Sequence, residues 1–130
     1  MTCPACGGET LAFPVPATLR DHAPGGGERA VVCTTCLRTH ATDSVAAEDP
    51  DFSTIHAAFP SGEAGAALSL ALGLLDSLAL RRDAVDNCCA HAERAGADVL
   101  LTLDRLAGDE AVDPYVDLDR RRHQLAELLR

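Results

Sequence analysis

The pattern of apolar and polar residues changes along this chain. Short apolar runs occur before about residue 42, and apolar residues recur at helical spacing from about residue 61. Short apolar runs predict three β-strands, at Glu9 to Val15, at Ala30 to Val32 and from Leu37 to Ala41. Pro16 to His22 predicts one helical turn, because proline suits the first position of a helix. The first third of the chain therefore predicts short β-hairpins.

The second half of the chain predicts three to four helices, whose ends are marked by residues that favour helix caps. Gly96 and Gly108 are expected to end the second and third helices. The expected helices run from Ser61 to about Leu80, from about Arg82 to Ala95, from Val99 after the cap Asp98 to Ala107, and from Asp113 or Asp117 to about Leu129.

Residues 43–60 lie between these regions and predict a linker, because Asp49-Pro50 and Phe59-Pro60-Ser61-Gly62 are typical of turns. Ile55 and Phe59 are four residues apart, so a short helix is expected to dock there. The chain thus divides into a β-rich segment 1–42, a linker 43–60 and a helical domain 61–130. We expect the helices to have a Leu-rich core of their own.

Composition limits how the first segment can fold. Aromatic residues make up only 3% of the 130 residues and Trp is absent, so the core is expected to consist of Leu, Val and Ala. A segment of about 45 residues buries too little apolar surface to be stable without a disulfide or a metal. The sequence therefore calls for such a cross-link in residues 1–42.

Two Cys-x-x-Cys pairs supply the candidate cross-link, Cys3 with Cys6 and Cys33 with Cys36. Four cysteines on two facing turns match the tetrahedral four-thiolate geometry of structural Zn²⁺, although iron also fits such a set. The 26 residues between the pairs exceed the usual span of about 15–20. The excess falls in a loop rich in Pro and Gly. A redox role would require a βαβ context, which neither pair has. The α+β fold expected is a small zinc ribbon with two Cys knuckles, followed by helices.

The charge balance is strongly acidic, with 20 Asp and Glu against 11 basic residues, all of them Arg, and a net charge of −9. An acidic, Lys-free surface is typical of halophilic proteins, which stay hydrated in concentrated salt. A high-GC genome that favours Ala, Arg, Asp and Gly codons is the alternative explanation. No signal peptide is recognisable, so a cytoplasmic protein with metal-bound thiolates is expected rather than disulfides.

Small residues recur every four positions in the first long helix, at Gly65, Ser69, Gly73 and Ser77. Such a stripe predicts close approach of another helix, either within the chain or across a homodimer seam. The surrounding stretch from Ala64 to Leu80 has only one charged residue, Asp76. It is at the short limit for a membrane span, so we interpret it as a buried core helix.

Two further groups are candidate sites. Cys88 and Cys89 are adjacent on the second helix, where neighbours point about 100° apart, so they are expected to be buried small hydrophobes rather than ligands of one metal. The alternatives are a half-site formed by Cys88 and His91, or a catalytic thiol. His22 and His40 lie near the ribbon in sequence and are alternative ligands, although four cysteines already suffice.

The cluster Arg120-Arg121-Arg122-His123 is the densest basic run in the chain. It is expected to form a solvated helix face, with Asp117 paired to Arg121 and Asp119 to Arg122. Contact with a phosphate backbone is the alternative, which high salt would weaken.

Six sequence blocks together resemble a family of small uncharacterised haloarchaeal proteins that carry a CPxCG-type zinc ribbon followed by helices. The resemblance spans nearly the whole chain and implies zinc on the four cysteines and an archaeal cytoplasm, but no activity. Arg81 and Val99 depart from the Asn and Pro expected there. The blocks are Cys3 to Cys6, Leu19 to Pro24, Cys33 to Cys36, Pro60 to Gly65, Leu74 to Leu80 and Asp117 to Leu125.

These observations favour a non-catalytic zinc-binding protein that acts as a protein-interaction adaptor. The alternative is a nucleic-acid-associated zinc-ribbon factor, for which Arg20, Arg29 and Arg38 would have to form a positive patch. An enzyme is not expected, because a four-cysteine zinc has no open coordination position and no catalytic motif is present. The expected partner is a protein, with a homodimer and nucleic acid as further candidates and no membrane.

Overall fold

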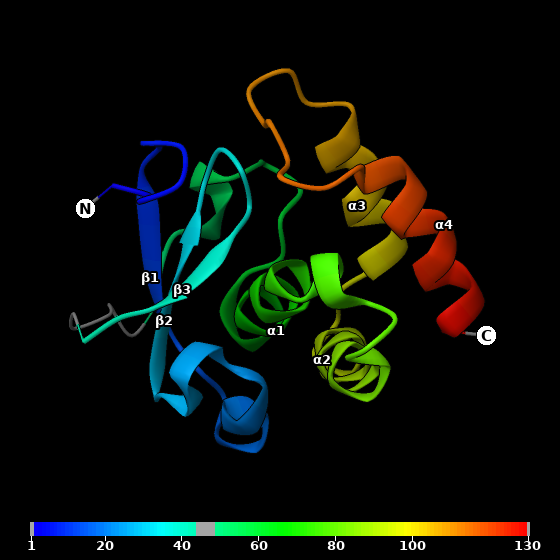
Figure 1. Ribbon diagram of the computed structural model, residues 1–130, viewed down its shortest axis with the longest axis horizontal. Helices are drawn as coiled ribbons and strands as arrows, with labels where there is room; N and C mark the ends of the chain where they lie inside the picture. Colours follow the sequence, from blue (N-terminus) through cyan, green and yellow to red (C-terminus); the bar gives the residue numbers. More distant parts are fainter. Residues whose placement is uncertain (1, 44–48, 130) are drawn as a thin grey trace.

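The computed structural model describes residues 2–43 and 49–129 and has a mixed α+β fold, with a small sheet beside a layer of helices (Figure 1). The strands are β1 (Thr10–Pro14), β2 (Arg29–Cys33) and β3 (Thr39–Ala41). The α-helices are α1 (Gly62–Gly73), α2 (Arg82–Arg94), α3 (Val99–Ala107) and α4 (Leu118–Leu128). Short 3-10 turns occur at Ala17–His22, Pro24–Gly26, Phe52–Thr54 and Leu75–Ser77.

The three strands form one antiparallel sheet in the order β1-β2-β3. Thr10 pairs with Cys33, and Val31 with His40. The register therefore places the second Cys pair at the end of the central strand. The helical turn expected at 16–22 is present as a 3-10 turn, Ala17–His22.

Helix α1 is the central element and lies between the sheet and α2 (Figure 1). Its residues from Ala64 to Leu72 are all buried, which explains why the segment shows no polar face. The helix ends at Gly73, so the prediction that it reaches Leu80 is wrong. The chain tightens there into 3-10 geometry, in which Leu74 and Ser77 donate to carbonyls three residues earlier. Among the described residues, no helix is long and apolar enough to cross a membrane.

The helix caps follow local chemistry. Asp98 accepts a hydrogen bond from the Leu101 N–H and Asp117 from the Arg120 N–H, so Asp117 rather than Asp113 caps α4. Arg81 occupies the cap position of α2 without a side-chain cap.

One hydrophobic core joins the sheet, the segment before α1 and the helices. Phe13 of β1 lies 6.0 Å from Phe52 and Phe52 lies 5.6 Å from Phe59, measured between ring centroids. All three rings belong to the same cluster as Leu68 and Leu103. The expectation of a separate helical core is therefore wrong, because the few aromatic residues fill the space between sheet and helices. The division at residues 42 and 60 stays a prediction.

The small-residue stripe on α1 is packed within the chain. A Cβ added at Gly65 would collide with the Pro60 carbonyl oxygen and the Phe52 ring, and one added at Gly73 with the Thr39 side chain. Ser69 is fully buried and donates to the Gly65 carbonyl at 2.8 Å. The expected partner helix is wrong at Gly65 and Gly73, because the 52–60 segment and β3 occupy that space, whereas the homodimer stays a prediction. Ser77 falls beyond the end of α1, in the turn Leu75–Ser77.

Candidate metal centre

The first Cys pair lies on a tight turn closed by main-chain hydrogen bonds. The Cys3 N–H donates to the Gly8 carbonyl at 2.7 Å, and the Gly7 N–H donates to the Cys3 carbonyl at 2.9 Å. Gly7 has a φ of 78°, in the left-handed region that glycine enters without steric cost. The turn is therefore specified locally by the residues around Cys3 and Cys6.

The second pair lies on a similar turn after β2. The Cys33 N–H donates to the Arg38 carbonyl at 2.8 Å, and the Leu37 N–H donates to the Cys33 carbonyl at 3.1 Å. Leu37 takes the place of Gly7 here, with a φ of 68° that is unfavourable for a side chain. Its side chain is 1% exposed. Burial of the leucine thus offsets the backbone strain.

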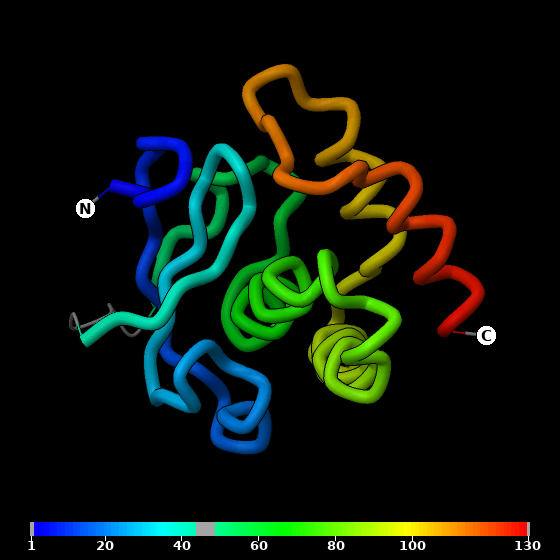
Figure 2. The backbone as a smooth tube through the Cα atoms, in the orientation of Figure 1, coloured from blue at the N-terminus to red at the C-terminus, as the bar shows by residue number. Residues whose placement is uncertain are grey.

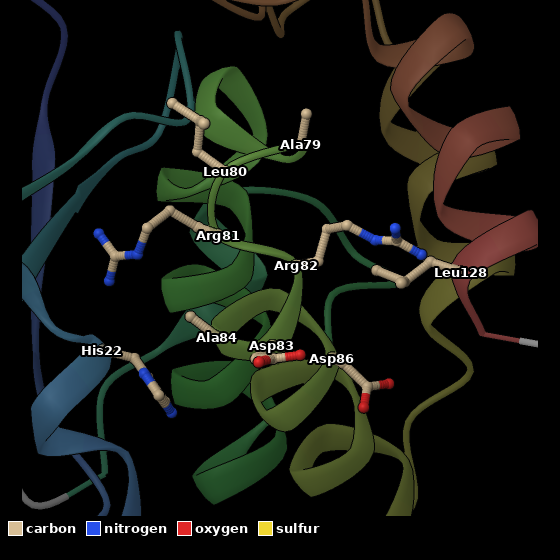
Figure 3. Close-up of a pocket in the computed structure, with 9 residues that line it drawn as sticks. All are labelled: His22, Ala79, Leu80, Arg81, Arg82, Asp83, Ala84, Asp86 and Leu128. Atoms are coloured by element: carbon tan, nitrogen blue, oxygen red, sulfur yellow. The ribbon is translucent and has the colours of Figure 1, made fainter.

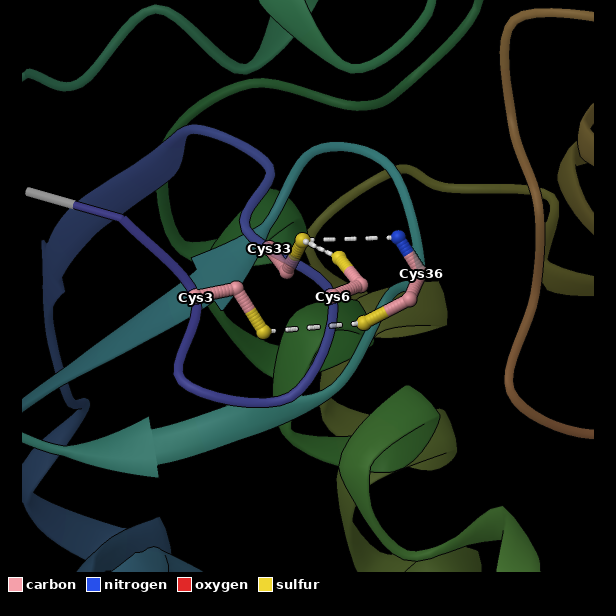
Figure 4. A group of neighbouring side chains, drawn as sticks. All are labelled: Cys3, Cys6, Cys33 and Cys36. Carbon is pink, nitrogen blue, oxygen red and sulfur yellow. Dashed lines mark hydrogen bonds between the residues drawn. The ribbon is translucent and has the colours of Figure 1, made fainter.

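The two turns bring the four cysteine sulfurs together (Figure 4). All four lie within 4.8 Å of one another, with 3.8 Å between Cys3 and Cys36 and 3.4 Å between Cys6 and Cys33. A tetrahedron with metal–sulfur bonds of about 2.3 Å has edges of about 3.8 Å, so this cluster has the size of a four-thiolate site. Cys6 is exposed and the other three are buried.

Main-chain N–H groups point at the sulfurs, as a thiolate requires. The Gly8 N–H donates to Cys6 Sγ, and the N–H groups of Thr35 and Cys36 donate to Cys33 Sγ, each at 3.4 Å. A Cβ on Gly8 would lie 2.7 Å from Thr35 Oγ1 and 3.1 Å from Cys33 Sγ. Gly8 therefore allows the two turns to approach, a role that no local signal in the sequence reveals.

The pKa values of the cysteine thiols in the cluster are shifted in different directions. Burial opposes ionisation of Cys3, but the N–H groups of Cys6 and Ala5 and the side chains of His40 and Cys36 outweigh it and lower the pKa to about 6. Burial raises the pKa of Cys33 to about 12 and also raises the pKa of Cys36. A divalent cation would offset the cost of holding several thiolates in this buried cluster.

Three side chains surround the cluster. His40 Nε2 lies 3.6 Å from Cys3 Sγ, which makes it a hydrogen-bond partner of a cysteine rather than a member of the cluster. Arg38 Nη1 donates to Cys36 Sγ at 3.6 Å, and the Tyr115 side chain packs against the buried cysteines. Sequence reasoning missed Arg38 and Tyr115. The position of Arg38 two residues after Cys36 is a weak signal in the sequence, and no signal points to Tyr115.

The remaining candidates lie elsewhere. Cys88 and Cys89 are fully buried on α2, and burial raises the pKa of each to about 12, so both are neutral thiols of the core. His91 pairs with Glu63 at 3.2 Å, and His22 contacts Asn87 at 3.3 Å. Within residues 2–43 and 49–129, the four ribbon cysteines are the group that the structure brings together for a metal.

Several arginines that were candidates for phosphate contacts are engaged by other side chains. Arg122 pairs with Asp104 of α3 at 2.8 Å and Arg121 donates to Gln124, so the pairs expected with Asp119 and Asp117 are not the contacts observed. Arg20 pairs with Glu28 at 3.9 Å and Arg38 is engaged at the cysteine cluster.

Comparison with known proteins gives a family but no activity. No curated protein matches the chain, and no solved structure matches it. One family model covers residues 2–129, nearly the whole chain. With its mixed α+β fold and its cluster of four cysteines, this protein therefore belongs to the family of unknown function DUF6276.

Proposed function

We propose that this protein is a non-catalytic zinc-binding adaptor that presents a surface to a protein partner. The observation that carries the proposal is the convergence of Cys3, Cys6, Cys33 and Cys36 within 4.8 Å. Four thiolates suit a structural zinc, which acts as a cross-link and leaves no coordination position for water or substrate. The acidic, Lys-free composition supports a halophilic, archaeal and cytoplasmic setting.

Support for the adaptor role comes from an exposed apolar side chain on a hydrogen-bonded turn. Leu80 is 90% exposed, the most exposed large hydrophobic residue in the described chain. Its turn is held by hydrogen bonds from the N–H groups of Leu80 and Arg81 to the Ser77 carbonyl, at 3.0 and 2.8 Å. Leu80 is thus presented on a fixed backbone, as an anchor for a partner requires.

The surroundings of Leu80 indicate the chemistry of the partner. A hollow of about 550 Å³ lies beside it, in which Arg82 reaches towards Leu128 and Arg81 extends to the other side, with Asp83 and Asp86 below (Figure 3). Arg82 also lines a neighbouring hollow of about 280 Å³ with Arg121. In the described part of the chain, neither Arg81 nor Arg82 forms an ion pair. A protein segment with a carboxylate beside an apolar side chain would satisfy both features.

The nucleic-acid alternative has less support. Two of the three arginines that would have to form its positive patch, Arg20 and Arg38, are already engaged by Glu28 and Cys36. The net charge of −9 also repels a polyanion.

Elemental analysis tests the metal. We expect about one zinc per chain in the purified protein and none in a Cys33→Ala variant, because three thiolates leave the tetrahedron incomplete. Cys89→Ala is the matched control, since it removes a buried thiol outside the cluster and should keep the zinc. A wild-type protein that carries iron, or that binds no metal, would refute the zinc assignment.

Leu80→Asp tests the adaptor surface. A protein that co-purifies with the wild type in molar salt should be retained about tenfold less by this variant, because an anchor residue is replaced by a charge. Leu101→Asp is the control, since Leu101 is 47% exposed on α3, and it should retain the partner. Zinc content should be equal in all three proteins. Equal retention by both variants, or retention of nucleic acid in place of protein, would contradict the proposal.

A further inference from the structure

We propose that residues 112–116, within the connection between α3 and α4, form a clamp that packs against the candidate metal centre, so that metal loading and docking of this connection strengthen each other. Figure 2 shows this connection running towards the turn that carries the second Cys pair. The inference rests on the proposed metal centre and adds a means by which the metal controls the helical layer.

The main chain of the clamp is hydrogen-bonded to the second Cys turn itself. The Asp113 N–H donates to the Thr35 carbonyl at 2.8 Å, and the Tyr115 N–H donates to the Cys36 carbonyl at 3.0 Å. The N–H groups of Thr35 and Cys36 themselves donate to Cys33 Sγ, so the position of that sulfur helps to set the shape of the loop. A change in that loop therefore breaks both hydrogen bonds of the clamp.

Side chains add a second connection. Arg38 Nη1 donates to Cys36 Sγ at 3.6 Å, and the guanidinium carbon lies 4.9 Å from the centroid of the Tyr115 ring. A thiolate on Cys36 makes the first contact charge-assisted and fixes the guanidinium against the ring, where a cation–π contact forms. Tyr115 in turn packs against the buried cluster of Cys3, Cys33 and Cys36.

The far end of Tyr115 reaches the central helix. Its hydroxyl donates to the Leu72 carbonyl at 2.6 Å, in the last turn of α1, where carbonyls lack partners within the helix. The clamp also leads directly into Asp117, the cap of α4. The state of the cysteine cluster is thus transmitted to α1 and α4, and α4 carries Arg121 and Leu128 of the proposed partner surface.

Linkage is reciprocal, so a clamp that is stabilised by metal must also strengthen metal binding. This reciprocity can be measured in the full-length protein by titrating Co²⁺ in the presence of a competing chelator, with binding read from the cobalt–thiolate absorption. We expect Arg38→Met and Tyr115→Leu each to weaken Co²⁺ binding by about 10–100-fold, the usual effect of losing an outer partner of a ligand. The double variant should lose less than the product of the two, because both residues belong to one contact chain.

Two variants separate the clamp from general destabilisation. Val99→Ala removes a buried side chain at the opposite end of α3; it should keep the cobalt spectrum and lower the affinity only by the amount that its lower stability accounts for. Tyr115→Phe keeps the ring over Arg38 but loses the hydroxyl bond to Leu72, so it should keep the spectrum and increase amide exchange in α1 and α4.

The outcomes are distinguishable. Wild type without a tetrahedral thiolate spectrum would overturn the metal centre and the clamp together. Normal binding by wild type, with Arg38→Met and Tyr115→Leu no weaker than Val99→Ala, would overturn the clamp and leave the metal centre in place. If Tyr115→Leu does not fold, Arg38→Met and Tyr115→Phe still decide the question.

Discussion

Removing the metal should unfold the sheet and the helices in a single transition. Structural zinc in small domains contributes an apparent binding free energy of about 10–16 kcal/mol, which matches or exceeds the usual domain stability of about 5–15 kcal/mol. In this chain the loss cannot stay within the ribbon. Phe13 and Val32 of the sheet share a core with Leu68 of α1, and Thr39 of β3 packs directly on Gly73.

Hydrogen exchange during stepwise addition of a chelator measures this. Amides of β1 to β3 and of α1 to α3 should lose protection at the same chelator concentration, together with the far-ultraviolet circular dichroism of the helices. Cys89→Ala is the control, because it lowers stability but leaves the four-cysteine cluster intact. It should lose protection in the same single transition, at a chelator concentration lowered only by its reduced stability. Helices that stay protected after the sheet has exchanged would instead support an independently folding domain from residue 61.

The four cysteines were predictable because a metal site depends on residue type and spacing, both of which are local. The two ends of α3 were predictable for the same reason, since Asp98 and Gly108 act on their own helix. The end of α1 was not. Its apolar run continues to Leu80, but the helix stops at Gly73, where Thr39 of a distant strand packs.

The residues that surround the cysteine cluster could not be predicted from the sequence, for a related reason. Tyr115 lies far along the chain from Cys36 and Leu72, yet it contacts both. Gly8 follows a glycine that already explains the turn, so its own role appears only when Thr35 is placed against it. Contacts of this kind depend on tertiary packing and leave no periodic pattern in the sequence.

The shared core has the same origin. Phe52 lies in a segment with turn-forming residues that predicts a linker, but its ring is 2% exposed and lies between Phe13 and Phe59. The local composition indicates a turn in the backbone around Phe52. It does not indicate that the Phe52 ring fills the space beside Gly65.

Replacing Gly73 with Leu should lower the free energy of unfolding by at least about 1–3 kcal/mol without changing the mass of the protein in solution. An added Cβ would collide with Thr39 Oγ1 and lie 2.8 Å from Thr39 Cβ. Rotation of the Thr39 side chain can move the hydroxyl away but not the Cβ atom, so β3 itself has to shift. That shift disturbs the strand that follows the second Cys turn, and zinc affinity should fall with stability.

Gly108→Leu is the matched control, because Gly108 also ends a helix but is exposed, and an added Cβ there has its nearest neighbour at 3.7 Å. It should change stability by no more than about 0.5 kcal/mol. Denaturant unfolding in molar salt, with light scattering on the same samples, measures both properties, since the net charge of −9 would add self-repulsion in dilute buffer. A Gly73→Leu protein of unchanged stability would refute the contact with β3. A halved mass with intact helices would instead place Gly73 between two copies of the chain.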